Sequence, residues 1–313
     1  MNVFMEIDLQ PNQSILVLHE GDNPTSDFYL KSRLAELSLP VRWVSLNEHP
    51  DPTLLSNTYV IVVRYLTPAW RRLLDKRFDS LAGCVWLIDD DLLDFSVLIQ
   101  VSRGLGWKWF WRAWRFKSWF KRKNAALWVS TPYLARKYTD WKPIILPPCS
   151  PYASSPKKPS KFEDYSKHPV VFYHGSISHW REQKWLCPIF VEVAKQLPEV
   201  VFEIIGNAKV ARYFESIPQV RVEPPMSWQS YKQWIQRPGR RIGLAPLLDD
   251  PVNAARAPTR FYDIQAAGAI GLYAVGPVYQ DVVIDGVNGF MLEMDQGVWV
   301  EKIVKLLVSG NTL

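Results

Sequence analysis

The chain has 313 residues, a length that exceeds one small domain and suits two domains of about 150 residues each. Hydrophobic residues make up 48% and charged residues 22% of it, which excludes a disordered polypeptide and indicates a globular one. A net charge of +6 and a pI of about 9.1 favour anionic partners such as phosphates, phospholipid surfaces or nucleic acid.

Two targeting features are absent from the sequence pattern. No apolar run approaches the roughly 20 residues that span a bilayer, and the first residues lack the basic-then-apolar layout of a secretory signal. The three cysteines, Cys84, Cys149 and Cys187, are far apart and show no metal-ligand spacing. We therefore expect a cytoplasmic protein whose cysteines stay reduced.

The first half alternates short apolar runs with helical patterns. A helix is expected at Phe28–Leu37, after the loop that follows the first strand. Strands separated by helices favour a parallel, doubly wound sheet, so residues 1–150 are predicted to form one Rossmann-like domain. Its expected strands are Ile15–Leu18, Val41–Val44, Tyr59–Val63, Cys84–Ile88, Leu127–Ser130 and Ile144–Leu146.

A proline-rich segment divides the chain. Five prolines lie between Pro147 and Lys161, a linker composition that we assign to residues 147–164. The alternation then restarts, which predicts a second Rossmann-like domain over residues 165–313 and a cleft between the two domains. Its expected strands are Val170–Tyr173, Val201–Ile205, Val220–Val222, Ile242–Ala245 and Ile270–Ala274. Its expected helices are Glu182–Gln196, Ser227–Gln236, Pro258–Ala267 and Val298–Leu307.

The helix over Pro258–Ala267 carries the most informative pair of residues. Arg260 and Asp263 are three positions apart, a spacing that places both on one helical face. The helix start and Arg260 suit a diphosphate, and Asp263 could accept hydrogen bonds from ribose hydroxyls. The alternative is an ordinary surface ion pair.

The residues around this helix resemble the carboxyl-terminal domain of the GT-B glycosyltransferases, in particular family 4 ("glycosyl transferases group 1"). That pattern is Pro-x-Lys-x-x-Glu-Tyr-x-Ala-x-Gly, a following strand, and Asp-Gly-x-Asn-Gly-Phe. Matching residues here are Pro258, Arg260, Asp263, Ala266, Gly268 and the run Asp285–Phe290. The resemblance covers roughly Val170–Leu307 and implies a nucleotide-sugar donor site.

Further donor-site candidates follow from that resemblance. The loop after the strand Val170–Tyr173 would bring backbone and basic groups to a diphosphate, with Arg181 favoured over Lys184 because a planar guanidinium matches it better. This chain lacks the first glutamate of the family's E-x7-E pair and has Asn253 and Arg256 nearby instead. The donor candidates besides Arg260 and Asp263 are Gly175, Ser176, His179, Arg181, Lys184, Gly206, Asn253 and Arg256.

Three consecutive acids, Asp89, Asp90 and Asp91, follow a strand directly. Adjacent like charges are costly unless something uses them. They are candidates for a catalytic base facing the acceptor. One alternative is a divalent-metal site of the GT-A type, and another is a solvated helix start.

The loops that follow other strands of the first half supply candidate acceptor contacts. These are His19, Asp22, Ser26 and Arg64. Ordinary loop polarity explains them equally well.

Residues 103–123 combine five tryptophans and three phenylalanines with eight basic residues and no acid. At helical spacing Trp107, Trp111 and Trp114 share a face, while Arg112 and Arg115 lie elsewhere on the helix. Tryptophan with lysine and arginine is typical of a helix in a membrane interface. Single-stranded nucleic acid and a core helix with solvated charges are the alternatives.

Together these features predict a glycosyltransferase that moves a sugar from a nucleotide-diphosphate sugar to a glycan or lipid-linked acceptor in cell-envelope polysaccharide or glycolipid synthesis. No cofactor and no metal are expected. We expect the enzyme at the inner face of the membrane, held to an anionic surface by residues 103–123, with no nucleic-acid partner. The alternatives are a metal-dependent GT-A transferase and a non-catalytic protein that binds a nucleotide sugar or nucleic acid.

Overall fold

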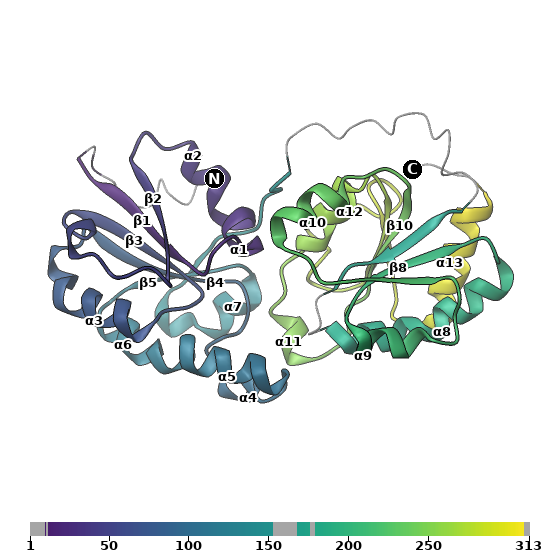
Figure 1. The fold of residues 1–313 in the computed structure, drawn as a ribbon, viewed down its shortest axis with the longest axis horizontal. Helices are drawn as coiled ribbons and strands as arrows, with labels where there is room; N and C mark the ends of the chain where they lie inside the picture. The colour runs from purple at the N-terminus through teal and green to yellow at the C-terminus, as the bar shows by residue number, and fades with distance from the viewer. Residues whose placement is uncertain (1–9, 11, 153–167, 176–178, 310–313) are drawn as a thin grey trace. The chain divides into compact units, whose positions relative to one another are not determined.

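The computed structural model describes residues 10, 12–152, 168–175 and 179–309. The chain divides into two compact units (Figure 1). The first contains Met1–Pro151 together with Asp250–Ala257, and the second contains Tyr152–Asp249 and Pro258–Leu313. Most of the predicted linker, residues 153–164, lies outside the described residues.

The first unit is built on a six-stranded sheet in which every pair of neighbours is parallel. The strand order is β2-β1-β3-β4-β5-β6, so chain order reverses between β1 and β3. In sheets of this kind ligands bind beyond the carboxyl ends of the strands at that reversal. The strands are β1 Ser14–His19, β2 Val41–Ser45, β3 Thr58–Val63, β4 Gly83–Ile88, β5 Ala126–Val129 and β6 Ile144–Ile145.

Helical segments connect these strands. The helix predicted at Phe28–Leu37 is three short pieces, of which the middle one is a π-helix, and Asn23 caps its start. The pieces are α1 Pro24–Ser26, η2 Asp27–Lys31 and α2 Ser32–Ala35. The others are η3 Pro52–Leu54, α3 Pro68–Arg77, η4 Phe78–Ser80, α4 Phe95–Leu98, α5 Arg103–Arg112, η5 Trp114–Phe116, α6 Lys117–Arg122, α7 Pro132–Lys137 and η6 Thr139–Trp141.

The second unit holds another six-stranded parallel sheet, ordered β12-β11-β10-β7-β8-β9. Here the chain order reverses between β7 and β10, the arrangement of a Rossmann fold. The strands are β7 Val170–Tyr173, β8 Val201–Ile205, β9 Val220–Glu223, β10 Arg240–Ala245, β11 Ile270–Ala274 and β12 Phe290–Leu292. The helices are α8 Trp180–Gln196, α9 Ala208–Ala211, η8 Arg212–Phe214, α10 Trp228–Ile235, α12 Thr259–Ala266 and α13 Gln296–Val308.

The predicted fold class is therefore confirmed: the protein is α/β, with two Rossmann-like domains. Ser227, the first residue of the helix expected at Ser227–Gln236, is the N-cap of α10 and accepts a hydrogen bond from the Ser230 amide. Pro258 takes the N-cap position of α12, so the helix begins at Thr259, one residue after the predicted start.

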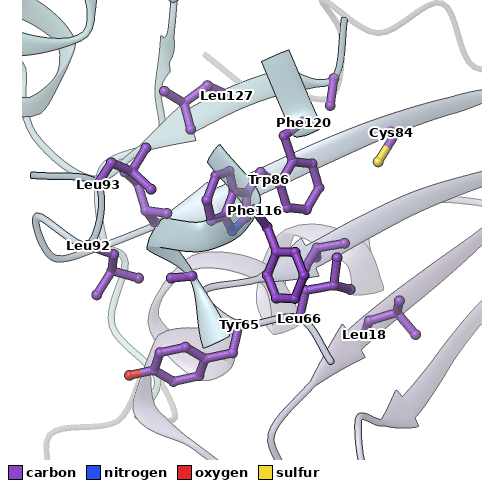
Figure 2. Packing of buried hydrophobic residues seen from close by; sticks show 14 of the residues in the cluster. Leu18, Tyr65, Leu66, Cys84, Trp86, Leu92, Leu93, Phe116, Phe120 and Leu127 are labelled. Carbon is purple, nitrogen blue, oxygen red and sulfur yellow. The ribbon is translucent and has the colours of Figure 1, made fainter. Parts of the chain in front are cut away.

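A single apolar cluster fills the first unit on one side of its sheet, and Figure 2 shows part of it. The Phe120 ring stacks on Trp86, with ring centroids 4.2 Å apart. Trp109, Phe116 and Phe120 are all nearly fully buried. The segment 103–123 is thus anchored to the core by a subset of its aromatic residues.

That segment is not one continuous helix. Ala113 adopts φ −133° and ψ −71°, which ends α5 and separates it from η5 and α6. After this break Trp114 packs against the core cluster and stacks on Phe110, with ring centroids 5.1 Å apart. Phe110 in turn contacts the rings of Trp107 and Trp111, so the three predicted tryptophans border one group of rings although they are not on one continuous helix.

The short helix α11, Pro251–Ala254, belongs with the first unit although it follows β10 of the second. Ala255 is fully buried in the first unit's core, and Val252 packs against the same cluster. Asp250 caps α11 through its carboxylate. The chain therefore leaves the second unit after Asp249 and returns to it at Pro258.

Candidate functional site

In the second unit the carboxyl end of β7 and the start of α12 meet through two side chains. Tyr173 is the last residue of β7, beside the reversal of chain order, and Arg260 lies in the first turn of α12. The guanidinium of Arg260 donates a 2.9 Å hydrogen bond to the Tyr173 hydroxyl, and it also lies over that ring, 4.4 Å from the centroid. Arg260 is therefore held in one position at the place where Rossmann sheets bind phosphates.

Asp263 follows one turn later on α12 and is held by a tyrosine from outside that helix. The Tyr152 hydroxyl donates a 2.5 Å hydrogen bond to Asp263 Oδ1, and the nearby Tyr231 also lowers the pKa of this carboxyl. Burial raises the pKa of Asp263 to about 6, against the opposing effects of the Tyr152 hydrogen bond and the Arg260 charge. Near neutral pH this carboxylate is ionised and oriented, with lone pairs that can accept further hydroxyl donors.

Behind Asp263 lies a buried polar chain that fixes Tyr231. The Nδ1 of His174 lies 3.3 Å from the Tyr231 hydroxyl, and its Nε2 lies 3.0 Å from Glu203 Oε1. Arg240 donates a 2.6 Å hydrogen bond from Nε to the same Glu203 oxygen. Burial lowers the pKa of His174 to about 4, so the imidazole is neutral.

The carboxylate of Glu203 completes that chain. Burial would raise its pKa, but the hydrogen bond from His174 and the Arg240 charge lower it overall. Glu203 thus remains ionised between a neutral imidazole and a guanidinium. This arrangement positions the Tyr231 side chain.

The loop and helix start after β7 contain the other basic candidates. Arg181 and Lys184 are exposed on the first turns of α8, and both cations lie over the Trp180 ring. His179 is buried, with Nδ1 3.8 Å from a carboxylate oxygen of Glu182. Glu182 is itself buried, and its charge raises the pKa of Arg260. Ser176 lies outside the described residues.

Two glycines named as donor candidates have packing reasons for being glycine. A Cβ on Gly175 would lie 2.8 Å from the Tyr173 ring, and one on Gly206 would lie 2.5 Å from Val210. A side chain at Gly175 would displace the ring that holds Arg260. At Gly206 it would push α9 away from the sheet.

In the first unit, Arg64 forms ion pairs with two of the three acids that follow β4. Its Nη1 lies 3.1 Å from Asp89 and its Nη2 lies 2.7 Å from Asp90. Arg64 adopts a left-handed backbone, φ 59°, directly after β3, which is uncommon for a residue with a side chain. Such a conformation costs about 1 kcal/mol or more and often marks functional positions. Thr25 adds a 2.7 Å hydrogen bond to the other oxygen of Asp89.

The two acids differ in how readily they hold a proton. Burial raises the pKa of Asp89, and the neighbouring Asp90 carboxylate adds to this effect, while Arg64 opposes it. For Asp90 burial is outweighed by Arg64 and Arg256, so its pKa is lowered. Asp89 is therefore the more basic carboxylate, and its side chain keeps 15% of its surface exposed.

Asp91 points elsewhere, although it is adjacent in sequence. Its side chain has no exposed surface. It pairs with Lys137 Nζ at 2.5 Å and accepts a hydrogen bond from Tyr138. Lys137 also pairs with Asp94 at 2.5 Å. Asp91 thus ties β4 to α7, which is a structural position and not that of a base facing an acceptor.

The remaining first-unit candidates are dispersed. His19 ends β1 and its Nδ1 lies 2.6 Å from the Gly21 carbonyl oxygen, whereas Asp22 is exposed and pairs with Lys31. Ser26 is 1% exposed inside α1, so an acceptor cannot reach its hydroxyl in this structure.

Two donor candidates belong to the first unit. Asn253 is buried and donates a 3.1 Å hydrogen bond to its own cap residue, Asp250. Arg256 follows α11, and its charge lowers the pKa of Asp90. The structure therefore groups Arg256 with the acids of the first unit and not with Arg260 and Asp263.

The sequence did not indicate several contributors to these sites, among them Tyr152, Tyr231 and Thr25. Tyr152 and Tyr231 are distant in sequence from Asp263, and no spacing rule connects them. Thr25 directly precedes Ser26, the residue that was named as a candidate acceptor contact. It is Thr25 that donates a hydrogen bond to Asp89. The N-cap of α1 at Asn23 could have indicated that Ser26 falls inside a helical turn.

No family model matches the sequence, and no curated protein is similar to it at a significant level. Solved structures do resemble its fold. HepE of Anabaena in complex with UDP and glucose is 12% identical, with a TM-score of 0.55 over 94% of this chain and 89% of HepE. The complex of HepE with UDP-glucose gives the same identity and TM-score over 95% of this chain and 90% of HepE.

A second protein has the same architecture. A TarM variant of S. aureus in complex with Fondaparinux, alpha-GlcNAc-glycerol and UDP is 11% identical, with a TM-score of 0.52. The match covers 81% of this chain and 49% of TarM, so this chain spans about half of the TarM length. The chain therefore shares the fold of HepE and TarM, with two Rossmann-like domains.

Within the described residues, no helix is both long enough and apolar enough to cross a bilayer.

Proposed function

We propose that this protein is a glycosyltransferase, of the family 4 type, that transfers a sugar from a nucleotide-diphosphate sugar to a glycan or lipid-linked acceptor. The observation that carries the proposal is Arg260, held against Tyr173 beside the chain reversal of a Rossmann sheet and one turn before the oriented carboxylate of Asp263. A fixed cation and a carboxylate at this separation suit a diphosphate and an adjacent ribose.

On the donor side, Arg260 and the start of α12 would bind the diphosphate, with Arg181 as an additional cation. Asp263 would accept hydrogen bonds from the ribose hydroxyls. HepE was solved with UDP-glucose, so a UDP-sugar is the first donor to test. No metal or cofactor is proposed, because guanidinium groups and the helix dipole would stabilise the departing diphosphate.

On the acceptor side, Asp89 would act as the base. In an inverting transfer the acceptor hydroxyl loses its proton to a carboxylate while its oxygen bonds to the anomeric carbon of the sugar. The bond between that carbon and the β-phosphate oxygen breaks, and the nucleoside diphosphate leaves. The raised pKa of Asp89 suits this role better than the lowered pKa of Asp90.

Arg64 would position both acids. It bridges Asp89 and Asp90 from a strained backbone position, so the separation of the two carboxylates is fixed. Residues His19 and Asp22, at the neighbouring strand end, remain proposed acceptor contacts. The acceptor is proposed to belong to cell-envelope polysaccharide or glycolipid synthesis.

The test is release of nucleoside diphosphate from a panel of nucleotide sugars, measured with and without simple glycan and lipid-linked acceptors. We expect turnover with at least one donor, which Arg260→Ala and Asp89→Asn each reduce strongly. The control Arg221→Ala removes an exposed arginine on β9 of the same unit and should be fully active. Tight donor binding without any turnover would instead indicate a non-catalytic nucleotide-sugar-binding protein.

A further inference from the structure

Four large apolar side chains gather on the outside of α4 and α5 and remain exposed. Phe95 is 52% exposed, Ile99 70%, Trp107 61% and Trp111 49%, and we call these four residues the aromatic patch. The Trp107 and Trp111 rings stack in parallel, with centroids 6.3 Å apart. Large apolar side chains that are exposed next to one another often mark an interaction site, whereas apolar side chains exposed singly do not.

The two helices are joined closely enough to make the patch continuous. A Cβ on Gly106 would lie 2.4 Å from the Leu98 carbonyl oxygen, so only glycine lets α5 approach α4 this closely. Between them lies a hollow of about 450 Å³ lined by Phe95, Ile99, Arg103 and Trp107, among others. Figure 1 shows α4 and α5 along one edge of the first unit.

A second hollow, of about 500 Å³, lies between α3 and the segment η5–α6 and contains four arginines. Its cations are Arg71, Arg72, Arg115 and Arg122, and we call it the arginine hollow. Arg71 pairs with Asp75 at 3.5 Å. Within the part of the chain that the structure describes, no carboxylate forms an ion pair with the other three.

Arg115 connects the two features. Its guanidinium lies over the Trp111 ring, 4.7 Å from the centroid, and it also lines the arginine hollow. An apolar surface for insertion therefore borders directly on unpaired cations. This is the combination by which interfacial helices bind anionic bilayers, with apolar rings at the acyl boundary and cations at the headgroups.

The same observations disfavour the other occupants. A second copy of this surface would oppose like charges, because residues 103–123 carry eight basic side chains and no acid. Single-stranded nucleic acid needs free ring faces for its bases. Here Trp107 and Trp111 stack on each other, and the most exposed member of the aromatic patch, Ile99, is aliphatic.

We infer that the aromatic patch and the arginine hollow together form a docking surface for an anionic phospholipid membrane. The side chains of the aromatic patch enter the interface, and the arginine hollow receives headgroup phosphates. This inference does not depend on the proposed transferase activity, because vesicle binding is measured without donor or acceptor.

The experiment is co-sedimentation of the full chain with vesicles of phosphatidylcholine alone or with about a third phosphatidylglycerol. Wild-type protein should bind the anionic vesicles preferentially, and high salt should weaken the binding. Arg72→Ser with Arg122→Ser should weaken it by on the order of 25-fold, since each cation near such a surface contributes about fivefold. Trp107→Ser with Trp111→Ser should weaken it by about tenfold or more.

Matched controls remove the same chemistry from other surfaces. Arg42→Ser with Arg221→Ser takes away two exposed arginines, and Ile284→Ser with Val287→Ser takes away two exposed apolar side chains. Both control pairs should bind anionic vesicles at least half as well as wild type. All variants change exposed residues, and thermal unfolding checks that each remains folded.

Three outcomes would overturn the inference. Wild-type protein could stay in the supernatant with anionic vesicles, or both test pairs could bind as tightly as the controls. Retention on a single-stranded oligonucleotide without vesicle binding would show that the surface serves nucleic acid instead.

Discussion

The Tyr152 hydroxyl donates a 2.5 Å hydrogen bond to Asp263 Oδ1, and this contact links residues 111 positions apart in sequence. It joins the residue that follows Pro151 to the middle of α12. Burial holds the pKa of Asp263 near 6, and the Tyr152 hydrogen bond keeps it from rising further. The ionisation of the proposed ribose-binding carboxylate is therefore set by a tyrosine outside the motif.

The affinity for a nucleotide sugar should depend on pH through Asp263. With a pKa of about 6 the carboxylate is ionised above pH 6 and protonated below it. We expect affinity to fall by up to about tenfold per unit below pH 6, because a protonated carboxyl accepts ribose hydroxyls poorly. Calorimetry with UDP-glucose is suitable, since its diphosphate does not titrate in this range. Asp263→Asn should bind weakly at every pH, and an unchanged pH profile in that variant would contradict the assignment.

Removing the Tyr152 hydroxyl should shift that pH profile upward. Tyr152→Phe loses a hydrogen bond that lowers the pKa of Asp263, so the midpoint should rise by about half a unit or more. Affinity well above the midpoint should change little. A loss of affinity of the same size at every pH would show that Tyr152 acts on the ligand directly.

The Lys137 ammonium should contribute to folding stability rather than to catalysis. Lys137→Met leaves the Asp91 carboxylate buried without its cation, which should lower the free energy of unfolding by about 3 kcal/mol near neutral pH. Denaturant unfolding measures this difference. Lys76→Met, an exposed lysine on α3, is the control and should change little.

The same variant carries a pH signature through Asp94. Although burial opposes it, Lys137 and Ser96 hold the pKa of Asp94 near 2, below the value of about 3.9 in an unfolded chain. This contribution to stability is present above about pH 4 and disappears as pH falls toward 2. Lys137→Met should therefore lose less stability than wild type between pH 4 and 2. Parallel curves would contradict the ion pair.

Transfer activity should survive metal removal. Arg260 and the start of α12 would supply the positive charge that a divalent cation provides elsewhere. Turnover measured in excess chelator should stay within about twofold of the untreated enzyme, because no step of the proposal requires a metal. Complete loss that added divalent cation restores would overturn this part of the account.

Much of the fold was predictable because strand and helix patterns are local. Val170–Tyr173, Val201–Ile205 and Ile270–Ala274 have the predicted bounds. The helix α3 was not predicted, because only Trp70 and Leu74 of its ten residues are buried. The sequence at its start does indicate a helix, because Thr67 is a favourable N-cap residue and Pro68 suits the first helical position.

Long-range contacts explain most of what the sequence did not reveal. Asp89 and Asp91 look equivalent in sequence, yet one contacts Arg64 and the other Lys137, because the chain bends at residues 89–90 directly after β4. The grouping of Asn253 and Arg256 with the first unit depends on the burial of Ala255, and no local pattern encodes that contact.

The most direct measurement is the thermal unfolding of wild-type protein and Arg260→Ala with nucleoside mono- and diphosphates and their sugars. A ligand at about a hundred times its dissociation constant stabilises the folded state by about 2.7 kcal/mol, which should raise the Tm of wild type by about 5 °C or more. We predict that shift with at least one diphosphate or nucleotide sugar, and a much smaller one in Arg260→Ala. If no nucleotide changes the Tm of wild type, or if Arg260→Ala responds equally, the donor site proposed around α12 is wrong.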